Sequence, residues 1–245
     1  MSKRPKLRTV GKSIPPCPLH DFPKDFPLTL GKEIIYLLAT KNRASLEGSE
    51  WEATFANCIG AEWKPSNVGL DDVVLGNTAW GAKTVKASNP ARCKQVRLIS
   101  GRNSIVYSFG ERIDASVDPN LPGAQVLQIW NARVTSIREK YQNLRTVALI
   151  KSNDLTTVKV FEFDTIRYDP ELFYWEWNKS NNLEGFDKDN KQHRFTWQPH
   201  GSQFTIKEDV PENSIVIKVK TPPPIEKDKL FDSIGFDPSW ITILK

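Results

Sequence analysis

Residues 70–86, LDDVVLGNTAWGAKTVK, hold two short apolar runs, a Gly-Asn dipeptide between them, two aspartates and a lysine. Asp72 leads directly into the first run, and Gly-Asn is typical of a tight turn between antiparallel strands. Because successive side chains point to opposite faces of a strand, Trp80 belongs to one face of the return strand, and Gly81 and Lys83 to the other. The stretch therefore predicts a β-hairpin with one apolar face and one charged face.

Segments with helical periodicity lie on both sides of this hairpin. Apolar residues at three- and four-residue spacing predict a helix from Leu28 to about residue 41, and a second helix follows and stops at Gly60. Ser49 and Glu52 have the spacing of a capping box at the start of that second helix. A longer helix is expected over 122–141, and two β runs, 146–150 and 157–163, come after it.

The chain order predicts an α/β fold in which a mixed central sheet is flanked by helices, with a β-rich C-terminal part. Residues 1–27 are rich in proline and lysine and are expected to form an extended arm. Residues 28–165 are expected to form the core. Residues 166–245 alternate aromatic and polar side chains, which is typical of strands in a smaller sheet packed on that core.

Composition narrows the class of protein further. The net charge of +5 and the isoelectric point near 9.0 favour a polyanionic partner. We expect no membrane-spanning segment, because no run reaches 18 apolar residues, and a cytoplasmic location, because the three cysteines are scattered and odd in number. Cys17 and His20 have the spacing of half a zinc site, but no second ligand pair accompanies them. No glycine-rich phosphate loop and no G-x-S-x-G motif occurs.

The charged face of the hairpin suits phosphodiester hydrolysis. Mg²⁺ polarises a phosphoryl oxygen and lowers the pKa of an attacking water, and it needs only one or two carboxylate ligands. A nearby lysine orients the water or stabilises the transition state. On an antiparallel hairpin, Asp72 and Lys83 can lie opposite each other on one face.

The same residues carry a family resemblance. LDDVVLGNTAWGAKTVK resembles the active-site hairpin of the PD-(D/E)XK nuclease superfamily, which includes most Type II restriction endonucleases. The resemblance implies that Asp72 is the metal-binding aspartate, with Asp71 in reserve, and that Lys83 is the catalytic lysine. It covers about residues 45–165, and the expected helices before and after the hairpin agree with the family's order.

One position departs from the family pattern, because Gly81 stands where a second acid is expected. The acid could have moved to Glu52, Glu50 or Glu62 in the preceding helix region, and Glu52 is the preferred candidate for both metal binding and catalysis. Alternatively, Asp71 or a backbone carbonyl supplies the missing oxygen while Mg²⁺ keeps its waters. A third possibility is that the site has been lost.

Polar and basic side chains that could read DNA gather in the last third of the chain and after the expected strand at 96–99. The candidates are Arg102, Asn103, Lys191, Gln192, His193, Arg194, Gln198, His200 and Gln203.

Together these patterns predict a Mg²⁺-dependent, sequence-specific endonuclease that cuts double-stranded DNA as a homodimer, since a symmetric duplex is met most simply by two copies. Two alternatives are a repair or recombination nuclease on the same core, and a non-catalytic DNA-binding protein with a degenerate nuclease fold. A carbohydrate-binding β module built on the tryptophans is a more distant alternative.

Overall fold

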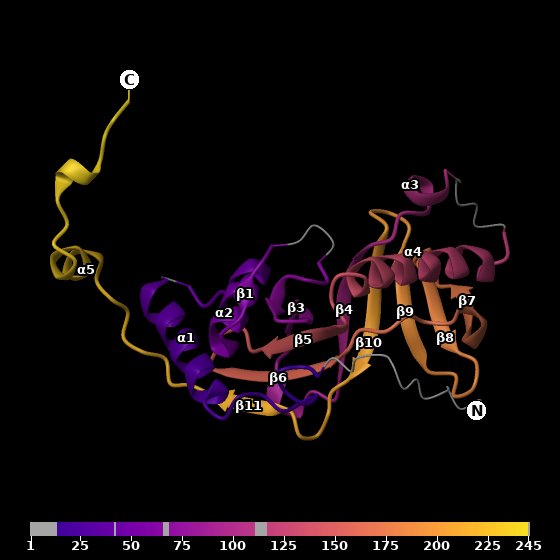
Figure 1. Ribbon diagram of the computed structural model, residues 1–245, viewed down its shortest axis with the longest axis horizontal. Helices are drawn as coiled ribbons and strands as arrows, with labels where there is room; N and C mark the ends of the chain where they lie inside the picture. Colours follow the sequence, from indigo (N-terminus) through magenta and orange to yellow (C-terminus); the bar gives the residue numbers. More distant parts are fainter. Residues whose placement is uncertain (1–13, 42, 66–68, 111–116, 245) are drawn as a thin grey trace.

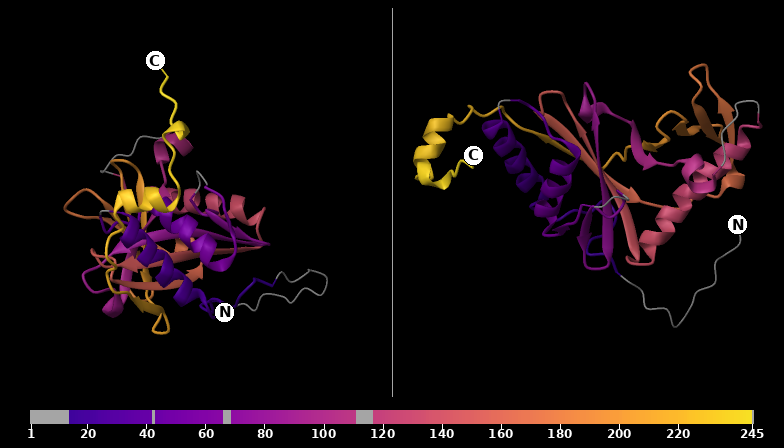
Figure 2. Two further views of the ribbon diagram at one scale, coloured as in Figure 1. Left: turned by 90° about the vertical axis from the view of Figure 1, so that its left-hand side faces the viewer. Right: turned by 90° about the horizontal axis from the view of Figure 1, so that it is seen from above.

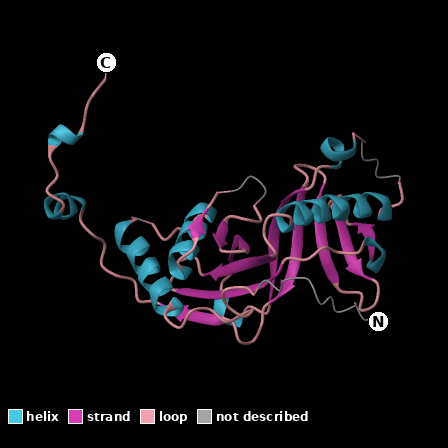
Figure 3. Ribbon diagram, in the orientation of Figure 1, coloured by secondary structure: helices cyan, strands magenta, loops and turns pink. Residues whose placement is uncertain are grey.

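The computed structural model describes residues 14–41, 43–65, 69–110 and 117–244 (Figure 1). The predicted α/β class is confirmed, with two separate sheets and helices packed on them (Figure 3). The first thirteen residues of the expected N-terminal arm lie outside the described residues. The helices are α1 (Phe26–Thr40), α2 (Gly48–Ile59), α3 (Ile105–Phe109), α4 (Asn120–Arg138) and α5 (Lys227–Ser233), with 3-10 turns η1 (Pro90–Arg92), η2 (Pro170–Leu172) and η3 (Pro238–Trp240).

The larger sheet has six strands and is mixed. Across the sheet the order is β1 (Glu62–Trp63), β2 (Val73–Leu75), β3 (Thr78–Lys86), β5 (Asn143–Lys151), β6 (Thr157–Asp164) and β11 (Ile215–Lys218). Neighbouring strands are antiparallel except β3 and β5, which run parallel because α4 lies in the connection between them.

The smaller sheet has five strands and is wholly antiparallel. Its order is β4 (Gln95–Arg102), β10 (Gln203–Asp209), β9 (His193–Gln198), β8 (Leu183–Asp187) and β7 (Phe173–Trp177). Helix α4 lies across it, as Figure 1 shows. Gly123 permits this close approach, because a Cβ atom there would lie 2.3 Å from the ring of Trp175 on β7.

The predicted hairpin forms with the expected faces. Val73 pairs with Trp80 across β2 and β3, and Gly76 turns the chain with a φ of 60°. Trp80 and Ala82 are buried among apolar side chains of α1 and α2, such as Phe55. The opposite face of the six-stranded sheet packs against α4 and β4. Within the sheet, β1 and β5 flank the hairpin, so neither of its strands is at an edge.

The two sheets exchange strands along the sequence. Strand β4 precedes α4 in the chain but pairs with β10, and β11 follows β10 but pairs with β6. The boundary expected at residues 165 and 166 therefore does not separate the two sheets.

Local details differ from the sequence prediction at the start of α2. Its N-cap is Glu47, and the reciprocal capping bonds join Glu47 and Glu50 instead of Ser49 and Glu52. The helix begins earlier than predicted, which leaves Glu52 within the helix and free of any capping role. The predicted stop at Gly60 is confirmed by its left-handed φ of 65°.

A buried ion pair ties residues near position 20 to the core. The Arg145 guanidinium lies 2.9 Å from Glu162 Oε1, and both side chains are at most 5% exposed. Glu162 also accepts hydrogen bonds from the His20 backbone N–H and the Trp80 indole N–H, and Arg145 donates to the Cys17 carbonyl. The segment expected to be an extended arm is thus anchored here by its backbone.

None of the described helices combines the length and the apolar character needed to cross a bilayer.

Candidate functional site

Asp72 and Lys83 meet on the face of the hairpin that is turned away from α1 and α2. Asp72 Oδ2 lies 3.5 Å from Lys83 Nζ and accepts a hydrogen bond from the Ala82 N–H at 3.2 Å. Lys83 Nζ also donates to the carbonyl of Gly69 at 2.8 Å. The Asp72 side chain is only 3% exposed, whereas that of Lys83 is 20% exposed. Lys83 is therefore the member of the pair that solvent can reach.

Burial dominates the electrostatics of Asp72. It raises the pKa of the Asp72 carboxyl above the ordinary value, and the nearby Lys83 charge and the Ala82 N–H offset only part of that rise. Carboxyl groups with a shifted pKa occur both at catalytic sites and in structural ion pairs.

Asp71 adds an oxygen without a partner. Its Oδ1 atom is buried and makes no hydrogen bond within the part of the chain that the structure describes. A buried carboxylate oxygen left in this state costs free energy unless a donor or a cation satisfies it. Asp71 and Asp72 together offer the one or two carboxylates that Mg²⁺ needs, so their chemistry fits that ion.

Glu52 lies on α2 and contacts β1. Its Oε2 atom accepts a hydrogen bond from the Trp63 indole N–H at 3.2 Å. Burial raises the pKa of the Glu52 carboxyl, and the charges of Asp72 and Lys83 act on it in opposite directions. Glu52 is thus within electrostatic range of the pair. However, no group of three or more His, Cys, Asp or Glu side chains suited to a metal ion occurs within the described residues.

Gly81 has a structural reason to be glycine. A Cβ atom there would lie 3.0 Å from the Gly69 carbonyl oxygen and 3.1 Å from Leu70 Cα, which are both backbone atoms. The 69–70 backbone therefore lies against position 81, where the family pattern has an acid. The same Gly69 carbonyl is the one that holds Lys83 Nζ.

Arg133 on α4 was not among the predicted site residues. It donates to the Ser100 carbonyl at 2.7 Å and to Asn103 Oδ1 at 3.1 Å. Burial lowers the pKa of the Arg133 guanidinium, and the charge of Asp72 opposes that change. Arg133 thus bonds residues at the end of β4 and also interacts, through its charge, with Asp72. A single arginine among the apolar positions of a predicted helix was the only signal for it in the sequence.

The predicted DNA-reading residues do not gather on one surface. Arg102, Gln198, His200 and Gln203 lie at one end of the five-stranded sheet, where Gln203 pairs with both Gln198 and Arg102. Lys191, Gln192 and His193 lie at or beside the β8–β9 turn, at the opposite end. Strands of this length separate the two groups by roughly 17–20 Å.

Two of those residues bond other parts of the fold. Asn103 is 0% exposed, and its side chain bonds the Val126 carbonyl and Arg133. Arg194 lies at a β-bulge and bonds Glu208 at 2.6 Å. Asn103 is completely buried and cannot reach a base edge, so we correct the prediction for it. The Arg194 side chain is 30% exposed and its guanidinium has further N–H donors, so contact of Arg194 with DNA stays a prediction.

The second group is partly engaged as well. Lys191 Nζ lies 5.1 Å from the centre of the Tyr174 ring, and a ring nitrogen of His193 contacts the Phe195 carbonyl oxygen at 2.7 Å. Burial lowers the pKa of the His193 imidazole, and Lys207 lowers it further. His193 thus favours its neutral form and adds little charge for a phosphate.

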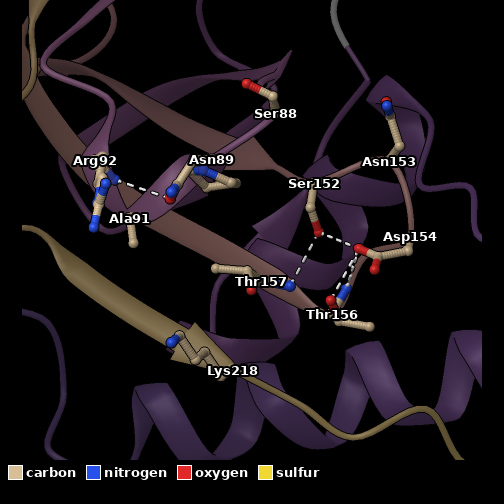
Figure 4. Close-up of a pocket in the computed structure, with 11 residues that line it drawn as sticks. Ser88, Asn89, Ala91, Arg92, Ser152, Asn153, Asp154, Thr156, Thr157 and Lys218 are labelled. Atoms are coloured by element: carbon tan, nitrogen blue, oxygen red, sulfur yellow. Dashed lines mark hydrogen bonds between the residues drawn. The ribbon is translucent and has the colours of Figure 1, made fainter.

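A polar pocket of about 660 Å³ lies elsewhere, between the turns that follow β3 and β5 and beside Lys218 of β11 (Figure 4). It contains none of the predicted site residues. Asp154 at its edge already accepts hydrogen bonds from Ser152 Oγ and the Thr156 N–H. The pocket therefore does not belong to the Asp72 site.

Comparison with known proteins gives no match for this chain among protein-family models, curated proteins or solved structures.

Proposed function

We propose that the chain is a Mg²⁺-dependent, sequence-specific endonuclease that hydrolyses phosphodiester bonds of double-stranded DNA, in the manner of a Type II restriction enzyme. One observation carries the proposal: the buried Asp72 carboxylate faces the partly exposed Lys83 ammonium at 3.5 Å on a central hairpin. Helix α2 before the hairpin and helix α4 after it agree with the order that the resemblance implies.

Asp71 and Asp72 would hold the ion, and Glu52 is the third acid in range. When bound, Mg²⁺ would polarise the phosphoryl oxygen and activate water. Lys83 Nζ, which the Gly69 carbonyl and Asp72 hold, would contact the scissile phosphate or its attacking water. The Arg133 charge adds to the attraction of this region for a phosphate.

DNA contacts would come from the end of the five-stranded sheet that holds Arg102, Gln198, His200 and Gln203. Asn103, next to Arg102, bonds Arg133, whose charge interacts with Asp72. Through Asn103 and Arg133, this end of the five-stranded sheet is therefore connected to the Asp72–Lys83 pair. The homodimer and the cytoplasmic location are part of the same proposal.

The decisive experiment is digestion of a mapped phage DNA with Mg²⁺ and with EDTA. We expect discrete fragments that require Mg²⁺ and disappear with Lys83→Ala. Lys86→Ala is the matched control, because Lys86 is an exposed lysine on the same strand. Its digestion pattern should equal that of the unmodified chain. A smear without discrete bands would instead support the repair or recombination nuclease.

The second acid is identified by three parallel variants, Glu50→Gln, Glu52→Gln and Glu62→Gln. Glu50 bonds Lys41 and caps α2, and Glu62 is exposed, so we expect only the Glu52 variant to lose cleavage while keeping its fold. Cleavage that survives all three substitutions would show that Asp71 and Asp72 suffice.

A non-catalytic DNA-binding protein is the second candidate. The observation that favours it is the packing of Gly69 and Leu70 against Gly81, which fills the place of the family's second acid. Intact DNA in the digestion, with a salt-sensitive gel shift that persists in Lys83→Ala, would select this candidate.

A further inference from the structure

Residues 226–244 project away from the body of the molecule, beyond α1 (Figures 1 and 2). The segment leaves the fold at Ile225, whose N–H donates to the Ala39 carbonyl at the end of α1. We name residues 226–244 the projecting segment. Apart from the half-buried Phe236, every residue in it is exposed.

The projecting segment is nevertheless folded. Its helix α5 and turn η3 are joined by aromatic contacts of Phe236 with Phe231 at 5.0 Å and with Trp240 at 5.7 Å. A seven-residue helix is not stable by itself in water, so such a segment needs a surface to pack on.

Large apolar side chains cover the projecting segment. They are between 37% and 89% exposed, and they are Leu230, Phe231, Ile234, Trp240, Ile241, Ile243 and Leu244. Single exposed apolar residues are ordinary on a soluble protein, but a run of seven within fifteen positions is typical of an interaction site.

A second unpartnered apolar surface lies on α1, next to the point where the segment leaves. Leu28, Ile35 and Tyr36 are 65%, 40% and 62% exposed. Their spacing of seven and eight residues places them on one side of the helix, while Leu30 and Ile34 are buried on the other side. We name Leu28, Ile35 and Tyr36 the α1 stripe.

We propose that the projecting segment packs on the α1 stripe of a second copy of this chain, and that the second copy's segment makes the same contact in return. Both surfaces lie at one end of the molecule and are linked through Ile225 and Ala39. Two such surfaces suit a two-fold symmetric dimer. The segment of each copy then packs on the stripe of the other copy, so the same contact forms twice.

Charge supports a second copy as the occupant. The projecting segment carries four acidic side chains and two lysines, whereas the whole chain has a net charge of +5. Around the α1 stripe the exposed Lys24 and Lys32 stand beside the exposed Asp25 and the partly exposed Glu33, so the stripe itself carries little net charge. The acidic segment has the opposite sign of charge to the remainder of the chain, which favours a second copy of the chain as its partner.

A reciprocal contact makes a larger interface than a single contact. A stable interface buries about 800 Å² on each partner. In a reciprocal contact, the seven apolar side chains of the segment and the three side chains of the stripe are buried in both copies.

Light scattering coupled to size-exclusion chromatography tests the proposal at micromolar protein concentration. We expect the full chain to have about twice the 27.9 kDa mass of one copy. A chain ending at Pro224, Phe231→Asp and Tyr36→Asp should each elute as monomers. Tyr107→Asp on α3 is the matched control, because Tyr107 is 92% exposed and lies far from α1, and it should remain dimeric. Circular dichroism confirms that each variant is folded.

Mixing the variants distinguishes a contact between copies from one within a copy. Tyr36→Asp keeps its segment and the chain ending at Pro224 keeps its stripe, so together they should form a mixed dimer with one intact contact. A monomeric full chain, a dimer unaffected by truncation, or the absence of the mixed dimer would each overturn the proposal. The inference rests on the proposed function for the homodimer alone. The measurement uses no DNA, so a monomeric chain would overturn this interface and the homodimer, while DNA cleavage is tested separately by the digestion.

Discussion

Glu162→Gln is the substitution that best tests how the hairpin is held in place. Glu162 accepts three hydrogen bonds, from Arg145 at 2.9 Å, from the His20 N–H at 3.0 Å and from the Trp80 indole at 2.8 Å. Gln keeps the shape but replaces one acceptor oxygen with an NH₂ group and removes the charge. The variant therefore leaves the Arg145 guanidinium buried without its counter-ion, and places a donor against a donor.

The size of the loss follows from the burial of the pair. At 2.9 Å and an effective dielectric constant of about 20, the attraction between the two charges is on the order of 6 kcal/mol before desolvation is subtracted. Removal of one partner from a buried pair costs about 3–5 kcal/mol. For a chain of this length, that cost corresponds to a decrease in Tm on the order of 10 °C.

The double variant Arg145→Met/Glu162→Leu separates the charge from the packing. It removes both charges, so it should recover part of the loss and remain below the unmodified chain by about 1–3 kcal/mol, because the Trp80 indole loses its acceptor. Urea unfolding, followed by tryptophan fluorescence and circular dichroism, gives the free energies. The exposed Glu212→Gln is the control and should be neutral.

A loss below about 1 kcal/mol for Glu162→Gln would refute the reasoning, since it would mean that Arg145 does not need its buried partner. A double variant less stable than Glu162→Gln would also refute it.

Three further outcomes are expected. Gly81→Ala should lower the free energy of unfolding by about 1–3 kcal/mol, measured in urea, because its Cβ would press on the Gly69 backbone. Burial raises the pKa of Asp72, so the folded chain binds a proton at the Asp72 carboxyl more tightly than the unfolded chain does. The ionised carboxylate therefore destabilises the fold at pH 8, and Asp72→Asn should be at least as stable there as the unmodified chain. That advantage should vanish as the pH falls below about 4, where the Asp is protonated in both states; thermal unfolding across this pH range measures it. In gel shifts, Gln203→Ala should weaken specific DNA binding by about 1–3 kcal/mol while Lys191→Ala has little effect, and equal losses would contradict the assignment of DNA contacts to one end of the sheet.

Much of the fold followed from local patterns in the sequence. The hairpin, the stop of α2 at Gly60 and the long helix α4 depend on turn residues and apolar spacing that a short window contains. The start of α2 did not, because Glu47 with Glu50 and Ser49 with Glu52 have the same spacing. The structure uses the first pair, so the helix begins before the predicted cap.

Strand partners could not be read from the same windows. The alternation in β4 and β11 identifies strands and their faces, but it does not specify which strand lies alongside, because that choice depends on residues more than fifty positions away. This is why β4 was assigned to the core and β11 to the smaller sheet.

The candidate site was only partly visible in the sequence. Asp72 and Lys83 meet as their spacing indicated, and Glu52 comes into range of both. The packing of residues 69–70 against Gly81 had no signal, because it arises from the path of a loop rather than from a motif. The burial of Asn103 was likewise invisible, since a polar residue after a strand is ordinarily exposed.

The exchange of β4 and β11 between the sheets has a consequence for protein engineering. A graft that aims to change DNA specificity by replacing residues 166–245 would remove β11 from the six-stranded sheet and leave β4 without its partner β10. Strand β6 would then become a new edge of the six-stranded sheet and β4 would have no strand to pair with, and unpaired strands invite aggregation. A workable chimaera must carry β4 together with β7–β10 from one parent and keep β11 from the other, so the unit of exchange is a set of strands and not a stretch of sequence.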